Sequence, residues 1–188
     1  MLKTSDQDVP WQSWLGDFTQ ALELEIGYGS SRLLYTLARN APDTKFIGVD
    51  KNPFWHEAAV RKMLRARNGI SNLTYLNAEG LFFLESHVPS SRLQRLHIYF
   101  PSPHPRDERI FSSRFVDEVY RVLIYGGEMR VITDSRNYFN DIARLLNTEG
   151  WRYLRWKPLS VPLAEGLLVG TPCEFEYGSK YVLQSIKI

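Results

Sequence analysis

Residues that could bind a nucleotide-like ligand lie in two parts of the sequence, at 25–29 and at 50. In "LEIGYGSSRLL", Glu25 precedes Gly27 and Gly29, and glycines at such a turn let the backbone bend tightly and approach a ligand. Asp50 follows Gly29 by 21 residues. A carboxylate after the second strand of an α/β unit can accept hydrogen bonds from ribose hydroxyls. The pattern therefore indicates a ligand that carries a ribose.

The charges around this turn favour a cationic ligand without phosphate. The run from Gly27 to Arg32 lacks the third glycine of the dinucleotide fingerprint, and Glu25 would repel a pyrophosphate. S-adenosylmethionine has a ribose, a sulfonium and an ammonium but no phosphate, so it suits the set better. A third stretch, "LNAEG", completes the predicted cofactor site, although each part alone could be a glycine turn or a helix cap. The predicted cofactor ligands are Glu25, Gly27, Gly29, Asp50, Asn77, Ala78 and Glu79.

A second candidate functional segment is the proline-rich stretch "YFPSPHPR". Three prolines at alternate positions end an apolar run, because each removes a backbone donor and fixes its φ. Such a loop would hold Ser102 and His104 rigidly, with Arg106 just after them. His104 could act as a general base, stack on a flat substrate or be a solvated loop residue. The sequence favours a function for it, because it lies between two prolines.

Strand-like and helix-like segments alternate along the chain and predict the positions of these loops. Such alternation is typical of a Rossmann-like, doubly wound α/β fold with a mostly parallel sheet and helices on both faces. Ligands of this fold bind beyond the carboxyl ends of the strands. We expect seven strands, with 21–27 and 45–50 paired in parallel, and a helix running from Ser112 to the glycine pair at 126–127. The other predicted strands lie at 73–77, 95–100, 128–133, 151–156 and 180–188, and the other helices at 31–40, 53–69, 80–88 and 135–150.

Composition is typical of one globular domain. The 188 residues are 44% hydrophobic and 23% charged, and the chain has a single cysteine, Cys173. We therefore expect no internal disulfide, a reducing cytoplasmic location and no membrane association. No metal site is expected. The net charge of +2 gives only weak support for a nucleic-acid partner, and the sequence makes no prediction about oligomeric state.

From about residue 22 to the end, the chain resembles the tRNA (guanine-N7-)-methyltransferases. The resemblance is carried by "LEIGYGSS", "APDTKFIGVD", "NLTYLNAEG", "YFPSPHPR", "GGEMRVITDSRNY" and "TPCEFE". It implies an S-adenosylmethionine-dependent N-methyltransferase in one domain, 21–188, with an antiparallel last strand, preceded by a 1–20 segment that could be a lid. It also implies catalytic residues Ser102, His104 and Asp134, and substrate-binding residues Arg106, Tyr138, Thr171, Glu174 and Glu176.

Several departures from the family pattern bear on the methyl acceptor. Ser102 stands where the family has aspartate, His104 where it has tryptophan, and the basic cluster expected after Arg106 is missing. A carboxylate can hold the guanine edge, and Lys and Arg supply the phosphate contacts that dominate affinity for RNA. These losses favour a purine-like small molecule and predict weak tRNA binding. The candidates to replace the missing carboxylate are Asp107, Glu108, Asp134, Glu174 and Glu176.

Two other functions stay open. The chain could be a tRNA guanine-N7 methyltransferase with an altered loop, or a cofactor-binding interaction protein without catalysis. Some residues also have a purely structural interpretation. Asp134 could cap the following helix, and a basic run that includes Arg61, Lys62 and Arg65 could be a solvated helix face.

Overall fold

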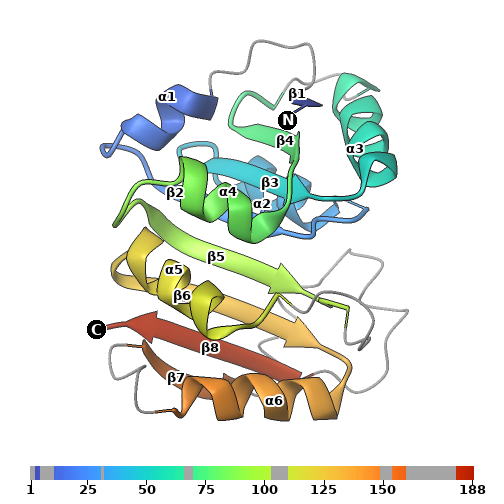
Figure 1. Cartoon of the computed structure of the whole chain (residues 1–188). Coiled ribbons are helices and arrows are strands. Elements are labelled where there is room, and N and C mark those ends of the chain that lie inside the picture. The colour runs from blue at the N-terminus through green and yellow to red at the C-terminus, as the bar shows by residue number, and fades with distance from the viewer. Residues whose placement is uncertain are drawn as a thin grey trace.

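The fold is built around one eight-stranded sheet (Figure 1). The structure, a computed structural model, describes residues 3–4, 11–30, 32–65, 70–102, 110–148, 154–159 and 181–188. The strand order is β1-β4-β3-β2-β5-β6-β8-β7. The strands are β1 (Lys3–Thr4), β2 (Leu22–Ile26), β3 (Lys45–Asp50), β4 (Leu73–Asn77), β5 (Leu93–Tyr99), β6 (Leu123–Thr133), β7 (Leu154–Leu159) and β8 (Tyr181–Lys187). The helices are α1 (Trp11–Gly16), α2 (Arg32–Asn40), α3 (Pro53–Arg65), α4 (Gly80–His87), α5 (Ser113–Val122) and α6 (Arg136–Leu146).

The pairing confirms the predicted mostly parallel sheet. β2 pairs in parallel with β3 and with β5, β3 with β4, and β5 with β6. β8 is antiparallel to both β6 and β7, as expected for the last strand. The two-residue β1, antiparallel to β4, was not predicted. The chain runs outward from β2 to β4 and then returns beside β2 as β5, so the strand order reverses between β2 and β5. Ligands of open α/β sheets bind at such a switch point.

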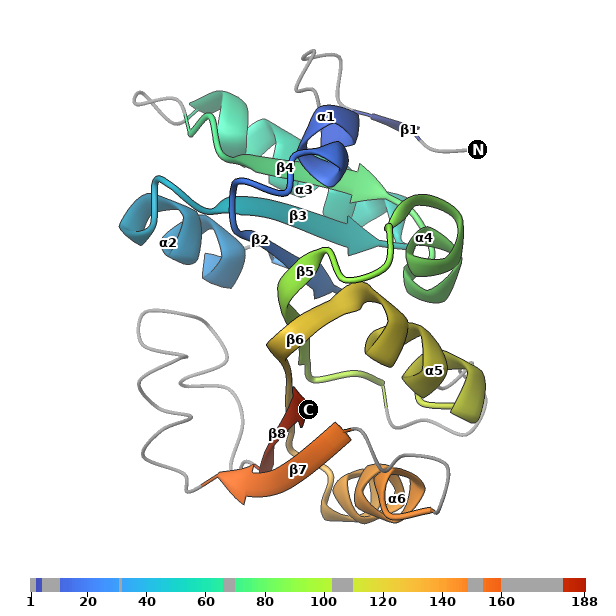
Figure 2. The same cartoon turned by 90° about the vertical axis from the view of Figure 1, so that its left-hand side faces the viewer.

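Helices cover the two faces of the sheet unequally (Figure 2). The larger core joins α1, α4, α5 and α6 to one face, through side chains such as Leu24, Phe83 and Phe115, which are fully buried. On the other face α2 and α3 pack through Leu34 and Ala59 against β3 and β4. Among the described residues, no helix is long and apolar enough to cross a membrane.

The helix predicted to reach the glycine pair is shorter than expected. α5 ends at Val122, and β6 begins at Leu123 and runs through Gly126 and Gly127. Leu123 is fully buried opposite Leu93, and the register between β5 and β6 shifts just after that pair. Burial of Leu123 against the neighbouring strand therefore decides where the helix ends, and the glycines lie in the irregular part of β6.

The first helix is part of the core. Trp11 and Trp14 are buried, and the Trp11 ring lies 5.7 Å from that of Phe83 in α4. The Arg92 guanidinium donates to the carbonyl oxygens of Trp14 and Leu15, at 2.6 to 3.1 Å, and so anchors the end of α1 beside the start of β5. This is the amino end of the parallel strands, away from the ligand side (Figure 1). The structure thus gives α1 a packing role, and a lid role for residues 1–20 remains a prediction.

We expect Gly48→Ala to destabilise the protein. A Cβ at Gly48, in the middle of β3, would lie 2.7 Å from the Tyr75 ring and 2.8 Å from the Tyr28 ring. Both rings are buried, so neither can move aside easily, and overpacking of this kind costs about 1 to 3 kcal/mol. Urea denaturation measures the loss. Gly16→Ala is the control, because beyond its own helix a Cβ there meets no atom of the described residues within 4 Å. Equal stability of the two variants would contradict the argument.

Candidate cofactor and acceptor site

Asp50 connects the loops that follow three neighbouring strands. One carboxylate oxygen accepts from the Gly29 N–H at 3.0 Å and the other from the Asn52 N–H at 2.8 Å. The Asp50 carbonyl oxygen accepts from the Ala78 N–H at 3.1 Å and from the Asn77 side chain at 2.8 Å. The loops after β2, β3 and β4 therefore meet at one residue. Asp50 is 8% exposed, and each of its carboxylate oxygens keeps lone-pair capacity for a ligand hydroxyl.

The glycine turn presents bare backbone next to Asp50. Gly27 and Gly29 have φ values of 78° and 46°, in the left-handed region that favours glycine. In the described part of the chain, apart from the adjoining residues, no atom lies within 4 Å of where their side chains would begin. These described residues therefore leave room for a ligand to approach the backbone of the turn closely.

Tyr28, the residue between these glycines, anchors the turn to the core. The Tyr28 side chain is buried, with its ring centroid 4.7 Å from that of Tyr75 and its hydroxyl oxygen 3.2 Å from His56 Nδ1. These contacts join the turn to β4 and α3. The turn is consequently held by core packing as well as by Asp50.

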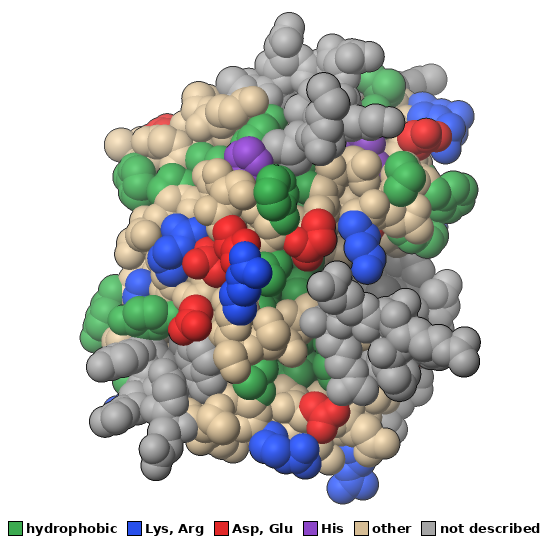
Figure 3. Space-filling view, viewed as in Figure 1, with side chains coloured by type: hydrophobic (Ala, Val, Ile, Leu, Met, Phe, Trp, Pro, Cys, Tyr) green, Lys and Arg blue, Asp and Glu red, His purple; other side chains and the backbone are tan. Residues whose placement is uncertain are grey.

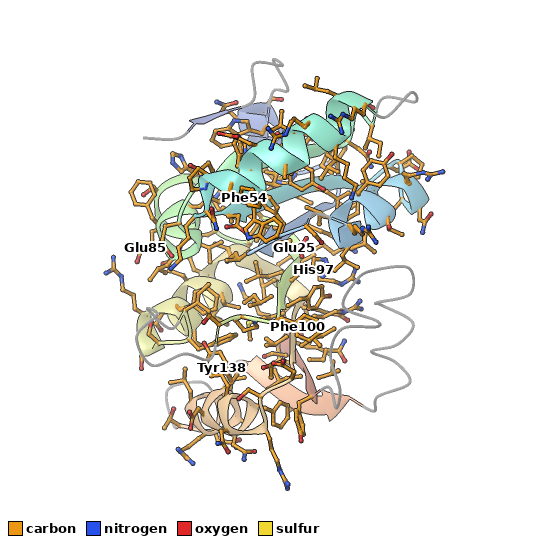
Figure 4. The ribbon with its side chains drawn as sticks, turned by 90° about the vertical axis from the view of Figure 1, so that its right-hand side faces the viewer. Glu25, Phe54, Glu85, His97, Phe100 and Tyr138 are labelled. Carbon is orange, nitrogen blue, oxygen red and sulfur yellow. The ribbon has the colours of Figure 1, made fainter. Side chains whose placement is uncertain are left out.

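Glu25 contributes a buried carboxyl group to the site. Its side chain is 4% exposed, and its Oε2 atom is buried with no partner among the described residues. Burial, and then the nearby Asp50 charge, raises the pKa of Glu25 from 4.5 to about 8. A cationic ligand would stabilise the ionised carboxylate. Figure 4 views the carboxyl ends of the parallel strands, with Glu25 near the middle of the sheet.

Asn77 and Glu79 have structural roles in this site. The Asn77 amide supports Asp50, as described above. The Glu79 carboxylate caps α4 by accepting from the N–H groups of Leu81 and Phe82 at 3.0 and 2.6 Å. The structure thus shows the helix-cap role for Glu79, and contact with a cofactor remains a prediction for both residues.

The acceptor side begins where β5 ends. Phe100 has a φ of 50°, which is rare for a bulky residue, and its N–H donates to the Ile132 carbonyl at 2.7 Å. Such strain tends to occur at functional sites. It turns the chain after β5 into Pro101 and Ser102, at the carboxyl edge beside the switch point.

Two predicted acceptor residues lie after the neighbouring strand, β6. Asp134 is exposed and does not cap α6, because the Ser135 hydroxyl accepts from the Tyr138 N–H. The Tyr138 ring is 2% exposed and packs 6.1 Å from the ring of Phe111, so the structure shows it in the core. Its role in substrate binding remains a prediction. The other predicted residues, His104, Arg106, Asp107, Glu108, Thr171, Glu174 and Glu176, lie outside the described residues.

A buried polar network that was not predicted lies beside Glu25. His97 Nε2 is 2.7 Å from a Glu23 oxygen, and His97 Nδ1 is 2.7 Å from the Tyr99 hydroxyl. Burial lowers the pKa of His97, so the ring is neutral. A neutral ring donates from Nε2 to the Glu23 carboxylate and accepts the Tyr99 proton at Nδ1.

Arginines complete this network across the sheet. Arg95 lies 2.5 Å from Glu23 and 3.2 Å from Glu128, and Arg130 lies 2.7 Å from Glu128. Burial opposes ionisation of Glu23, but the His97 hydrogen bond and the arginines hold its pKa below the usual value. One sequence signal could have revealed the network. Charged or polar residues alternate with apolar ones at 23 and 25 in β2 and at 95 and 97 in β5, on strands that a parallel sheet buries.

Known proteins share both sequence and fold with this chain. A family model described as putative methyltransferase matches residues 19–158. The tRNA (guanine-N(7)-)-methyltransferase of Rubrobacter xylanophilus is 30% identical over 142 residues, which cover 73% of this chain and 62% of that protein. That of Wolinella succinogenes is 36% identical over 127 residues, covering 65% of this chain and 31% of that protein. The chain therefore spans less than two thirds of the length of these relatives.

Solved structures show the same fold. The aminoglycoside resistance methyltransferase NpmB1 matches with a TM-score of 0.63 and 19% identity, covering 100% of both chains. The 16S rRNA methyltransferase KamB matches with a TM-score of 0.64 and 17% identity, covering 98% of this chain and 94% of that one. At these identities the likeness establishes the fold alone, and it confirms the predicted Rossmann-like methyltransferase architecture. The family match covers more than half of the sequence, so this chain belongs to the putative methyltransferase family.

Proposed function

We propose that this protein transfers the methyl group of S-adenosylmethionine to N7 of a guanine in tRNA, in the cytoplasm. The observation that carries the methyl-transfer part is the buried, partly unsatisfied carboxylate of Glu25 beside Asp50 and an open glycine turn. A dinucleotide would bring phosphates to this carboxylate, whereas S-adenosylmethionine brings positive charge. Family membership supports the same cofactor.

Different residues of the site would bind different parts of the cofactor. The Glu25 carboxylate would face the cationic part of the cofactor, and the remaining lone pairs of Asp50 would accept from the ribose hydroxyls. Gly27 and Gly29 allow the ligand to approach the backbone closely. Asn77, Ala78 and Glu79 would border the cofactor beyond β4, where they contact Asp50 or α4.

The tRNA acceptor is supported by the relatives, which are named for tRNA guanine-N7 methylation. Nothing in these comparisons supports the small-molecule acceptor that the sequence favoured, and we revise that prediction. Guanine N7 attacks the methyl carbon with its lone pair, and the electron pair of the breaking C–S bond goes to sulfur. No proton is removed in this step. The protein must position the ring and stabilise its new positive charge.

Two residues at the end of β5 and β6 can serve the acceptor. The Ser102 hydroxyl can hydrogen-bond to the guanine edge but carries no charge. Asp134 is an exposed carboxylate that follows β6, the strand next to β5. We therefore assign Asp134 the role of offsetting the charge on the methylated ring, in place of the family aspartate that Ser102 replaces.

Labelled methyl donor should yield N7-methylguanosine in an unmodified tRNA transcript. Asp134→Asn should lower kcat by about tenfold or more, because the cationic product loses its carboxylate, and should leave affinity for S-adenosylhomocysteine unchanged. Asp141→Asn in α6, at a partly exposed carboxylate paired with Arg144, is the matched control. Methylation of free guanosine but not of tRNA would reject the proposed acceptor.

Binding of the cofactor product should release a proton through Glu25. Between pH 6.5 and 7 this carboxyl is mostly protonated in the free protein, because its pKa is about 8, and the ammonium of S-adenosylhomocysteine favours the ionised form. Calorimetry in buffers of different ionisation enthalpy should show close to one proton released. Glu25→Gln should bind more weakly and release none. Identical proton release by both proteins would remove Glu25 from the site.

The same substitution should stabilise the ligand-free protein at neutral pH. A carboxyl whose pKa is raised on folding contributes stability that is fully present below about pH 4.5 and is lost as pH rises toward 8. Glutamine does not ionise, so Glu25→Gln should be more stable at pH 8, by on the order of 4 kcal/mol at most, and not at pH 4.5. Thermal denaturation at the two pH values measures the difference. A variant that is less stable at both would contradict the assigned pKa.

A further inference from the structure

The two helical layers of the protein differ in charge. α2 and α3 together carry five basic residues and one acidic residue, whereas α4, α5 and α6 carry four of each. The basic residues of the first pair of helices are Arg32, Arg39, Arg61, Lys62 and Arg65, and the acidic one is Glu57. The small net charge of the whole chain therefore hides an excess of positive charge on one face.

Pairing increases this difference. On the α4–α5 face Arg114 is bonded to Glu85 through two nitrogens, and Arg121 lies 2.7 Å from Glu118. Figure 3 shows acidic and basic side chains side by side over these helices. On α3 the pair Arg61–Glu57 is 3.8 Å long, with both side chains more than half exposed, and such pairs contribute little.

Positive groups of α2 and α3 also crowd together. Among the described residues, Arg32 and Arg65 form no ion pair. Lys62 Nζ lies 5.2 Å from the centre of the Tyr35 ring in α2. Burial lowers the pKa of Lys62, and repulsion from Arg32 lowers it further. A bound anion would relieve that repulsion.

Exposed aromatic rings lie at the end of this face nearest the site. Phe54 and Trp55 are 61% and 37% exposed, and their ring centroids are 5.1 Å apart in an edge-to-face arrangement. They occupy the first turn of α3, just after Asp50, and Figure 4 shows Phe54 on the ligand side above Glu25. Trp55 precedes Lys62 by seven residues, so the two share one side of α3. Rings that can stack on bases therefore lie beside cations that can pair with phosphates.

We propose that the outer surface of α2 and α3, formed by Arg32, Phe54, Trp55, Arg61, Lys62 and Arg65, binds the RNA substrate beside the methyl-transfer site. This proposal rests on the proposed function, because it states where the tRNA is held. The surface compensates for the basic cluster that is missing after Arg106. RNA is favoured over an acidic peptide because exposed rings that can stack on bases lie on the same surface as the cations.

A matched pair of double variants tests this surface. Arg32→Gln with Arg65→Gln removes two charges from it, and Arg136→Gln with Arg144→Gln removes two from α6 on the opposite face. Affinity for an unmodified tRNA transcript is measured over a range of salt concentrations. The first variant should weaken binding and flatten the slope of log affinity against log salt by about 1.4 to 1.8, since each lost phosphate contact accounts for about 0.7 to 0.9. The control should match the wild type.

The aromatic pair is tested in the same assay. Phe54→Ala and Trp55→Ala should each weaken tRNA binding by about tenfold without changing the salt slope, because stacking does not involve counterion release. Calorimetry with S-adenosylhomocysteine confirms that every variant is folded and keeps its cofactor site.

The outcomes separate this surface from the proposed function. If the wild type binds and methylates tRNA but the α2–α3 and α6 variants behave alike, the surface is wrong and the function stands. If the wild type binds S-adenosylhomocysteine but not tRNA, the tRNA acceptor is rejected and the surface with it. If the α2–α3 variant loses binding to phosphatidylserine vesicles while its tRNA binding is unchanged, the surface serves a membrane rather than RNA.

Discussion

The hydrogen bonds made by Asp50 are the constraint on which the site depends. A single residue at the end of β3 holds the turn after β2 through its carboxylate and the loop after β4 through its carbonyl. Parallel strands bring these loops to one edge of the sheet, but they do not fix where each loop goes. Asp50 does so before any ligand arrives. Cofactor binding then costs little loop ordering, which is how preorganised sites gain affinity.

Two glutamates of one strand show how neighbours decide what a buried carboxylate does. Glu23 is bonded to His97 and Arg95, so it stays ionised and stabilises the sheet where β2 meets β5. Glu25, two residues later on the same face, has Asp50 nearby instead of a cation, and its pKa rises. The cationic and hydrogen-bonding partners of Glu23 are residues of the protein. Glu25 gains a cationic partner only when a ligand binds.

The features of the site that depend on local sequence spacing were the most predictable. The glycine turn and Asp50 could be recognised because their roles follow from strand–turn–helix spacing. The end of α5 could not be predicted, because it depends on Leu123 pairing with Leu93, thirty residues earlier in the chain. The contact of His97 with Glu23 also depends on tertiary geometry, whereas the caps made by Glu79 and Ser135 are local contacts with N–H groups two or three residues away. The charge of the α2–α3 surface was visible as a basic run, but only the structure adds Arg32 from another helix.

The packing of Tyr28 has a consequence for the motion of the site. This ring lies between the glycine turn and the buried side chains of β4 and α3, so the turn cannot open unless the ring leaves the core. Loops around ligand sites usually exchange their amide hydrogens through small local openings that cost little. Here opening carries the cost of exposing a tyrosine and leaving a void beside Gly48. The amides of this turn should therefore exchange together with those of the central strands, so the most glycine-rich loop of the site belongs to its slowest-moving part.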